Sequence, residues 1–180
     1  MKTLTPGSYQ RLASQEALWR AWRHCRCGKR RNPTVARFEI DCDRHLLALQ
    51  RDLLTFRYRP SPWRLHRIRD PKTRLIAAPA VRDRVLHHAV LSEIGPVFER
   101  RFIDHSFAAG HGRGPHRAAL YFLACQRRYA WRLHLDISAY FLSINHTRLL
   151  DLFAERIVDA DTPKNFRIRA LHGRPGVVCR

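Results

Sequence analysis

The chain has 180 residues, with 34 Lys and Arg against 15 Asp and Glu and a formal net charge of +19. This length suffices for a domain with a hydrophobic core, and charges interrupt every apolar run before the ~18 residues that a membrane span needs. An arginine-dominated excess spread over patterned segments is typical of a protein that contacts nucleic-acid phosphates. A merely solvated basic surface is the alternative.

Signals for export and metal binding are weak. The N-terminus MKTLTPGSYQ lacks the apolar region of a secretory signal. Five cysteines without a framework spacing favour a reduced, cytoplasmic protein. A zinc site is a minor alternative, because the spacing does not fit a zinc knuckle in the candidate ligands His24, Cys25, Cys27 and Cys42.

Helices are predicted over the first part of the chain. Residues 9–30 place Leu12, Leu18, Trp19 and Trp22 on one apolar side. Asn32 and Pro33 form a good helix start, and a second helix runs from there to about Phe56. Its predicted core face consists of Phe38, Ile40, Leu46, Leu47, Leu49, Leu53 and Leu54.

A basic β-hairpin is predicted over residues 63–78. WRLHRIR alternates, the turn residues Asp70–Thr73 follow, and RLIAAP returns. The exposed positions carry Arg64, Arg67, Arg69, Lys72 and Arg74. Such a hairpin is either an edge protected by charge or a finger that closes over a phosphate chain, and composition leaves both open.

The next predicted helix covers residues 81–102, and Gly95-Pro96 should kink it or split it in two. Its apolar side consists of Val81, Val85, Leu86, Ala89, Val90, Ile94, Val97 and Phe98. A glycine-rich basic loop over 104–116 precedes a helix at 117–129, whose apolar side contains Ala118, Leu120, Tyr121, Ala124 and Cys125. A further helix at about 147–158 should bury Leu149, Leu150, Phe153 and Ile157.

The stretch between these last two helices carries the strongest chemical signal. In residues 131–137, apolar residues alternate with Arg132, His134 and Asp136, which predicts a strand with one buried face. A carboxylate at a strand end in so basic a chain is a plausible ligand for a divalent metal that handles phosphates. A surface carboxylate at Asp136 and a core aromatic at Phe141 are the alternatives. After residue 159 the pattern fades, as in an interrupted domain.

The order of these motifs resembles the N-terminal half of a reverse transcriptase. The similarity runs from about residue 50 to 155 through RLIAAPAVRDRVLHHAV, HSFAAGHGRGPHRA and LHLDISAYFLSINHTRLL. It is closest to the enzymes of diversity-generating retroelements, with group II intron and retron enzymes as relatives. The implied fold is α+β: the fingers and partial palm of a right-hand polymerase, helix-rich, with a basic β-hairpin and the first palm strand. The implied regions are an N-terminal helical region at 1–57, fingers at 58–130 and a truncated palm at 131–180.

The resemblance also implies roles for individual residues. Asp136 would be the catalytic residue that binds two Mg²⁺ ions, with the Ile137 carbonyl on one metal and Phe141 as a steric gate against ribonucleotides. The fingers residues that would bind the incoming nucleotide are Arg69, Lys72 and Arg74. Template or RNA contacts would come from Arg113, His116, Arg82 and Arg84.

The expected activity is RNA-directed DNA synthesis by a fragment that is inactive alone, because no aromatic-x-Asp-Asp motif follows Phe141. A truncated or frameshifted reading frame would explain that departure. The implied partners are template RNA, a nucleic-acid primer, deoxynucleoside triphosphates and a small basic helical accessory protein, with no membrane. The alternative is a non-enzymatic basic RNA-binding module or degenerate remnant. Half a palm would leave an open sheet edge, so we expect aggregation or partial disorder near the C-terminus.

Overall fold

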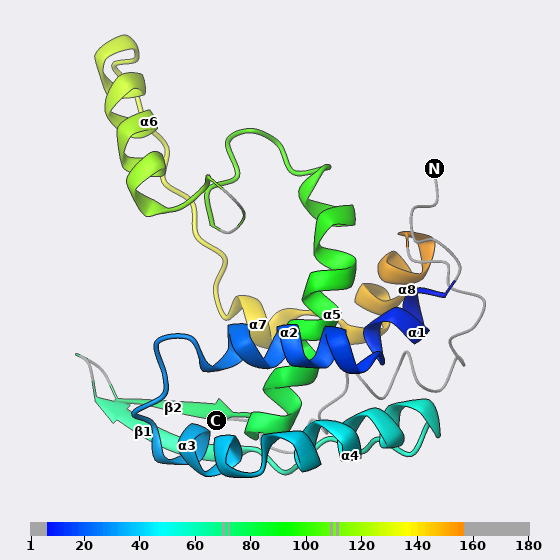
Figure 1. Ribbon diagram of the computed structural model, residues 1–180. Helices are drawn as coiled ribbons and strands as arrows, with labels where there is room; N and C mark the ends of the chain where they lie inside the picture. Colours follow the sequence, from blue (N-terminus) through cyan, green and yellow to red (C-terminus); the bar gives the residue numbers. More distant parts are fainter. Residues whose placement is uncertain (1–6, 70, 72, 109, 111, 157–180) are drawn as a thin grey trace. The chain divides into compact units, whose positions relative to one another are not determined.

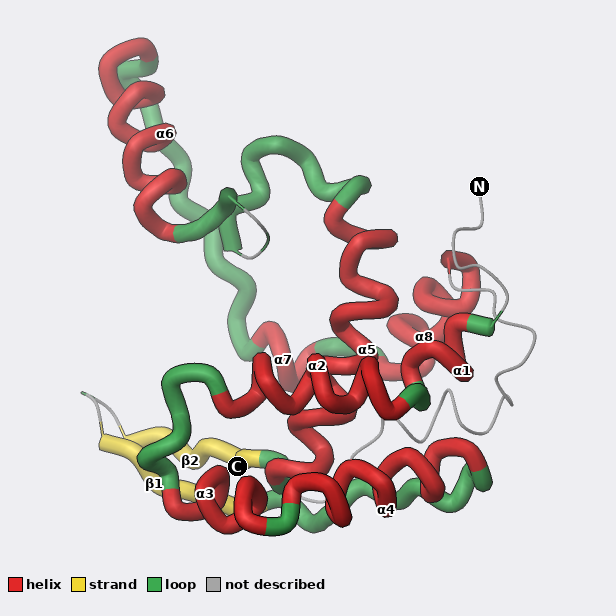
Figure 2. Tube along the Cα trace, in the orientation of Figure 1, coloured by secondary structure: helices red, strands yellow, loops and turns green. Residues whose placement is uncertain are grey.

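The computed structural model describes residues 7–69, 71, 73–108, 110 and 112–156. These residues form a helix-rich α+β chain with one small antiparallel sheet, as predicted (Figures 1 and 2). The chain divides into two compact units, residues 1–95 with 156–180 and residues 96–155. The boundaries predicted at 57/58 and 130/131 stay predictions. Among the described residues, every helix is too short or too polar to traverse a bilayer.

The predicted helix over 9–30 is two helices, α1 (Ser8–Leu12) and α2 (Gln15–Arg26). The Ser14 hydroxyl accepts a hydrogen bond from the Ala17 N–H at 3.2 Å and so caps α2 as a separate helix. The prediction of a single helix was wrong because the apolar spacing continues across this cap.

The predicted helix from Asn32 to Phe56 is also divided, into α3 (Pro33–Ile40) and α4 (Cys42–Leu54). The predicted start is confirmed, since Asn32 Oδ1 accepts from the Thr34 N–H at 3.0 Å. Asp41, with φ −117° and ψ 36°, leaves helical geometry and separates the two helices. Three predicted core residues are exposed, namely Ile40, Leu47 and Leu54.

The core of the first unit joins α1 to α5 (Val81–Glu99). The Trp22 and Phe38 rings pack with centroids 4.8 Å apart, and the Tyr9 hydroxyl donates to the Leu53 carbonyl at 2.8 Å. Other predicted core residues are confirmed as buried, namely Leu12, Leu18, Leu46, Leu49, Val81, Val85, Leu86 and Ala89. One contiguous cluster therefore supports the elements that flank the hairpin.

The hairpin is confirmed as β1 (Arg64–Arg69) paired antiparallel with β2 (Thr73–Ala78). The register sets Arg64 opposite Ala78 and Arg69 opposite Thr73. Every residue of β1 is exposed, so neither face of this ribbon is covered by the described residues. The pairing of the two strands, not a buried face, defines its register.

Helix α5 (Val81–Glu99) continues through Pro96, so of the two predicted alternatives the split into two helices does not occur, and the kink stays a prediction. The boundary between the two units nevertheless falls between Gly95 and Pro96. Proline has no N–H to donate to the preceding turn, which weakens the helix at this point. The apolar residues spaced over 81–89 face the core of the first unit, so their spacing predicted this part of α5 correctly.

The second unit contains α6 (Pro115–Arg128), α7 (Tyr140–Ser143) and nearly all of α8 (His146–Arg156). Phe98 and Phe153 meet edge to face with centroids 5.3 Å apart, which joins α5 to α8 within this unit. Helix α6 buries none of its residues. Its predicted apolar side is therefore open, with Leu120 69% exposed.

The predicted strand over 131–137 is wrong. These residues are irregular, and Trp131 and Leu135 are 93% and 78% exposed. A strand needs a neighbour for its N–H and C=O groups, and the described part of the chain offers it none, since the sheet there contains β1 and β2 alone. The expected burial of Ile157 and the expected disorder near the C-terminus fall outside the described residues.

Candidate nucleic-acid interface

The described arginines of β1 form an exposed basic surface on the hairpin. Arg67 and Arg69 are two residues apart on β1 and thus share one face, while Arg64 falls on the other. Among the described residues, none of the three takes part in an ion pair. Their guanidinium groups can therefore neutralise phosphates on a bound polyanion.

One other predicted nucleotide contact, Arg74, belongs to β2 of the same hairpin. The backbone of Arg74 lies opposite Ile68 in the ladder. Lys72 lies outside the described residues. The grouping of Arg69 with Arg74 on one hairpin is thus observed, while their contacts with a triphosphate stay a prediction.

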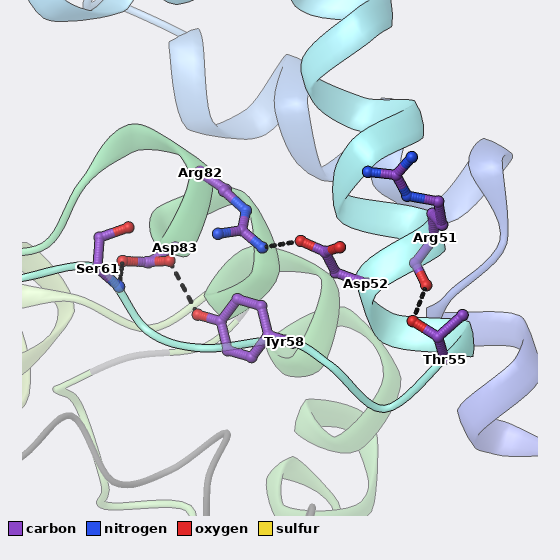
Figure 3. Close-up of polar contacts among 7 residues, drawn as sticks. All are labelled: Arg51, Asp52, Thr55, Tyr58, Ser61, Arg82 and Asp83. Carbon is purple, nitrogen blue, oxygen red and sulfur yellow. Dashed lines mark hydrogen bonds and ion pairs between the residues drawn. The ribbon is translucent and has the colours of Figure 1, made fainter.

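A buried carboxylate connects the base of the hairpin to α5 (Figure 3). Asp83, 2% exposed, accepts a hydrogen bond from the Tyr58 hydroxyl and a second from the Ser61 N–H, each of 2.9 Å. Both donors belong to the segment that leads into β1. Because a buried charge is costly without such partners, this arrangement holds the entry to the hairpin in place.

Arg82 completes this group, which we call the clasp and define as Asp52, Tyr58, Ser61, Arg82 and Asp83. The Arg82 guanidinium contacts Asp52 Oδ2 at 2.6 Å and lies over the Tyr58 ring, 5.1 Å from its centroid (Figure 3). Its side chain is 29% exposed. These internal contacts give Arg82 a structural role beside the template contact that stays a prediction.

The Tyr58 hydroxyl is held in its protonated form. Burial raises the pKa of Tyr58 well above its usual range, and the negative charge of Asp83 and the hydrogen bond to it act in the same direction. The Arg82 charge offsets part of this rise in pKa. The hydroxyl is consequently a constant hydrogen-bond donor at neutral pH.

The glycine-rich loop before α6 is organised by Arg113. Its guanidinium donates to the carbonyl oxygens of Ile103 and Ser106 and lies near the Phe102 ring. His116, the other predicted RNA contact here, is exposed in the first turn of α6. Arg113 therefore shapes the loop, and His116 is accessible to a ligand.

The predicted catalytic stretch is exposed. Asp136 and Ile137 lie on the irregular segment before α7, and Ile137 is 64% exposed. Ala139 follows with φ 50°, a left-handed conformation that is unusual for a residue other than glycine. Phe141 is the second residue of α7. In the part of the chain that the structure describes, no strand pairs with the segment that carries Asp136 and Ile137.

The implied Mg²⁺ ions stay a prediction, because the described residues do not by themselves provide the ligands of a two-metal centre. In those residues, no three His, Cys, Asp or Glu side chains come together to hold an ion. Asp136 supplies one exposed carboxylate, whereas a two-metal centre requires several oxygen ligands around both ions.

The predicted site residues fall into two sets. Arg69, Arg74, Arg82 and Arg84 belong to the first unit, and Arg113, His116, Asp136, Ile137 and Phe141 belong to the second. Sequence reasoning did not identify the clasp. Asp83 could have indicated it, because this aspartate lies in the first turn of a predicted helix, where an acidic side chain is favoured.

Comparison with known proteins gives a partial match. No protein-family model matches the chain. Protein YkfC of Escherichia coli (strain K12) is 32% identical over 124 residues, a match that covers 64% of this chain and 32% of that protein. The matched part thus spans about a third of the length of this curated relative.

Proposed function

We propose that this chain is the fingers and partial palm of an RNA-directed DNA polymerase, and that its hairpin contacts nucleic-acid or triphosphate phosphates. The observation that carries the proposal is the set of exposed hairpin arginines, Arg64, Arg67 and Arg69, which form no ion pair among the described residues. A net charge of +19 supports binding to a polyanion. The motif order that resembles reverse transcriptases supports the polymerase assignment.

The clasp gives the hairpin a defined base. Tyr58 and Ser61 both donate to Asp83, so the chain enters β1 from a fixed point on α5. A ligand then meets arginines on a hairpin whose base is already fixed, which reduces the conformational entropy lost on binding. In this proposal, template RNA and primer bind to the basic surface, and Arg69, Lys72 and Arg74 face the triphosphate of the incoming deoxynucleotide.

Catalysis would belong to a longer polymerase. Asp136 would act there with the carboxylates of an aromatic-x-Asp-Asp motif, which these 180 residues do not contain. Two Mg²⁺ ions and a small basic helical accessory protein are further parts of the proposal, and both rest on the resemblance to reverse transcriptases.

The second candidate is a non-enzymatic RNA-binding module. It is favoured by the exposure of Asp136 on an irregular segment, which suits a solvated carboxylate as well as a metal ligand. Both candidates bind RNA through phosphates, so salt dependence does not separate them. Only the polymerase candidate requires Asp136 for nucleotide addition.

The experiment joins this chain to the palm and thumb of a reverse transcriptase and measures primer extension on an RNA template with Mg²⁺. We expect Asp136→Ala to abolish incorporation. Asp151→Ala, which removes another exposed carboxylate from α8, should leave it unchanged. Incorporation that survives Asp136→Ala would remove the catalytic assignment and favour the RNA-binding module.

A further inference from the structure

A small cavity lies beside the last turns of α6, and we call it the α6 pocket. Phe122, Cys125 and Gln126 line it from the helix, and residues 129–132 line it from the chain that follows. Its volume is about 230 Å³. Sites for drug-sized ligands begin at about 300 Å³, so this pocket suits one small planar group. All of these residues belong to the second unit, so the shape of the pocket depends on that unit alone.

The pocket follows from the way in which α6 ends. The Tyr129 N–H donates to the Cys125 carbonyl at 2.9 Å, and Tyr129 then takes an extended backbone with φ −120° and ψ 129°. Phe122, Cys125 and Gln126 are three and four positions apart and therefore share one side of the helix. The chain turns back along this side, and the pocket lies between the two segments (Figure 1).

Three accessible aromatic rings line the α6 pocket. Trp131 is 93% exposed, and Phe122 and Tyr129 are exposed as well. Aromatic side chains left open to water in this way are the usual platforms on which the bases of single-stranded nucleic acids stack, because every base presents a flat π-face. The rings therefore favour a planar, aromatic ligand.

The pocket is also basic. Arg132 lines it and takes part in no ion pair among the described residues. The Arg128 guanidinium lies over the Tyr129 ring, 5.5 Å from its centroid, and this cation–π contact orders the ring. None of the described residues that line the pocket is acidic. A planar ligand that carries a phosphate would thus meet both aromatic rings and an unpaired cation.

We propose that the α6 pocket binds a single nucleobase, with the phosphate next to that base on Arg132. The base stacks on Trp131 or Tyr129, and the Gln126 amide, which both donates and accepts hydrogen bonds, can contact its polar edge. The base belongs either to single-stranded RNA or to a free nucleotide. Where it belongs to RNA, this inference rests on the proposed function, and it adds a contact separate from the hairpin.

The first arm of the test compares two labelled single-stranded RNAs of equal length, one with bases and one abasic, by fluorescence anisotropy with the full chain. Wild type should bind the RNA with bases about fivefold or more tightly than the abasic RNA. Trp131→Leu should remove about fivefold of this preference, whereas Trp131→Phe should retain most of it because the π-face is kept. Since Trp131 is exposed, both variants should fold.

The matched control is Leu133→Ala, which removes an exposed apolar side chain from the same segment but outside the pocket. It should leave the preference for bases unchanged. The salt slope separates stacking from charge: Trp131→Leu should keep the slope of wild type, and Arg132→Gln should lower it by about one.

The second arm titrates adenosine monophosphate and follows the Trp131 indole N–H by NMR, identified as the signal that Trp131→Phe lacks. A saturable shift that is weakened in Arg132→Gln assigns the pocket to free nucleotides as well, while an effect confined to RNA assigns it to RNA bases. If Trp131→Leu matches Leu133→Ala and the nucleotide leaves the indole signal unchanged, the inference is wrong.

Failure of the proposed function would look different. A hairpin variant, Arg67→Gln with Arg69→Gln, that keeps the salt slope of wild type would remove the hairpin contact, while a lost preference for bases in Trp131→Leu would still support the pocket. If wild type binds no RNA, the proposed function fails, and the nucleotide titration decides the pocket by itself.

Discussion

The Tyr58 hydroxyl donates a hydrogen bond of 2.9 Å to Asp83 Oδ1, and this bond joins the segment before the hairpin to the first turn of α5. The two residues are 25 positions apart. Because Asp83 is buried, loss of the hydroxyl would leave a charged acceptor incompletely satisfied. We therefore expect this hydrogen bond to stabilise the first unit and to help position the hairpin.

Tyr58→Phe should lower the free energy of unfolding by about 1–3 kcal/mol, the range for leaving a buried partner unsatisfied. Urea unfolding followed by circular dichroism measures the change. Tyr129→Phe is the control, because it removes the hydroxyl of an exposed tyrosine. Equal losses in the two variants would contradict a specific role for the clasp.

Alkaline pH should weaken the fold through Tyr58. Its pKa is raised in the folded state, so its contribution to stability is complete below the unfolded pKa of about 10 and is lost as pH rises toward the folded pKa. Unfolding midpoints above about pH 10 should therefore fall more steeply in wild type than in Tyr58→Phe. Some dependence should persist, because burial also raises the pKa of Tyr9. Parallel pH profiles would rule out this linkage.

Acidic pH should weaken the fold through His88. Its folded pKa is lowered, so its contribution is present above the unfolded pKa of about 6.5 and is lost as pH falls. His88→Gln should flatten the fall in stability between about pH 7 and 5, whereas His134→Gln, at an exposed position, should not. An unchanged profile in His88→Gln would contradict the prediction.

Primer extension by residues 1–180 alone should not exceed that of Asp136→Ala, because one exposed carboxylate cannot position two metal ions. Incorporation of labelled deoxynucleotides on an RNA template measures this. Activity of wild type above the variant would show that the chain is catalytically sufficient.

Sugar discrimination tests Phe141 in the longer polymerase formed by joining this chain to a palm and thumb. Phe141→Ala should increase the use of ribonucleotides, since the aromatic ring would no longer exclude a 2′-hydroxyl. The ratio of ribonucleotide to deoxynucleotide incorporation measures the effect. An unchanged ratio would remove the assignment of Phe141 as a steric gate.

Local patterns predicted the parts of the fold that local chemistry determines. The hairpin follows from alternation around a turn, and Asn32 caps α3 as its side chain and the following proline indicate. The break at Asp41 escaped prediction because the apolar spacing runs past it. Alternation over 131–137 predicted a strand, but pairing depends on a neighbour that no local pattern reveals.

The candidate site was likewise predicted where its features are local in sequence and missed where they depend on distant residues. Arg69 and Arg74 were correctly assigned to a hairpin because the turn lies between them in sequence. The clasp was not predicted, since the Tyr58 to Asp83 contact crosses the whole hairpin. Arg82 was expected to face RNA, and its contact with Asp52, 30 positions away, is visible only in the folded chain.

The most direct test of the central claim is the salt dependence of RNA binding by a variant with Arg67→Gln and Arg69→Gln. We predict that the salt slope falls by about two relative to wild type, one for each lost phosphate contact, with much weaker binding at low salt. The matched control replaces Arg37 and Arg51, which are exposed on α3 and α4, and should retain most of the slope. If the hairpin variant and the control lose the same slope, the hairpin is not the nucleic-acid contact that the account requires.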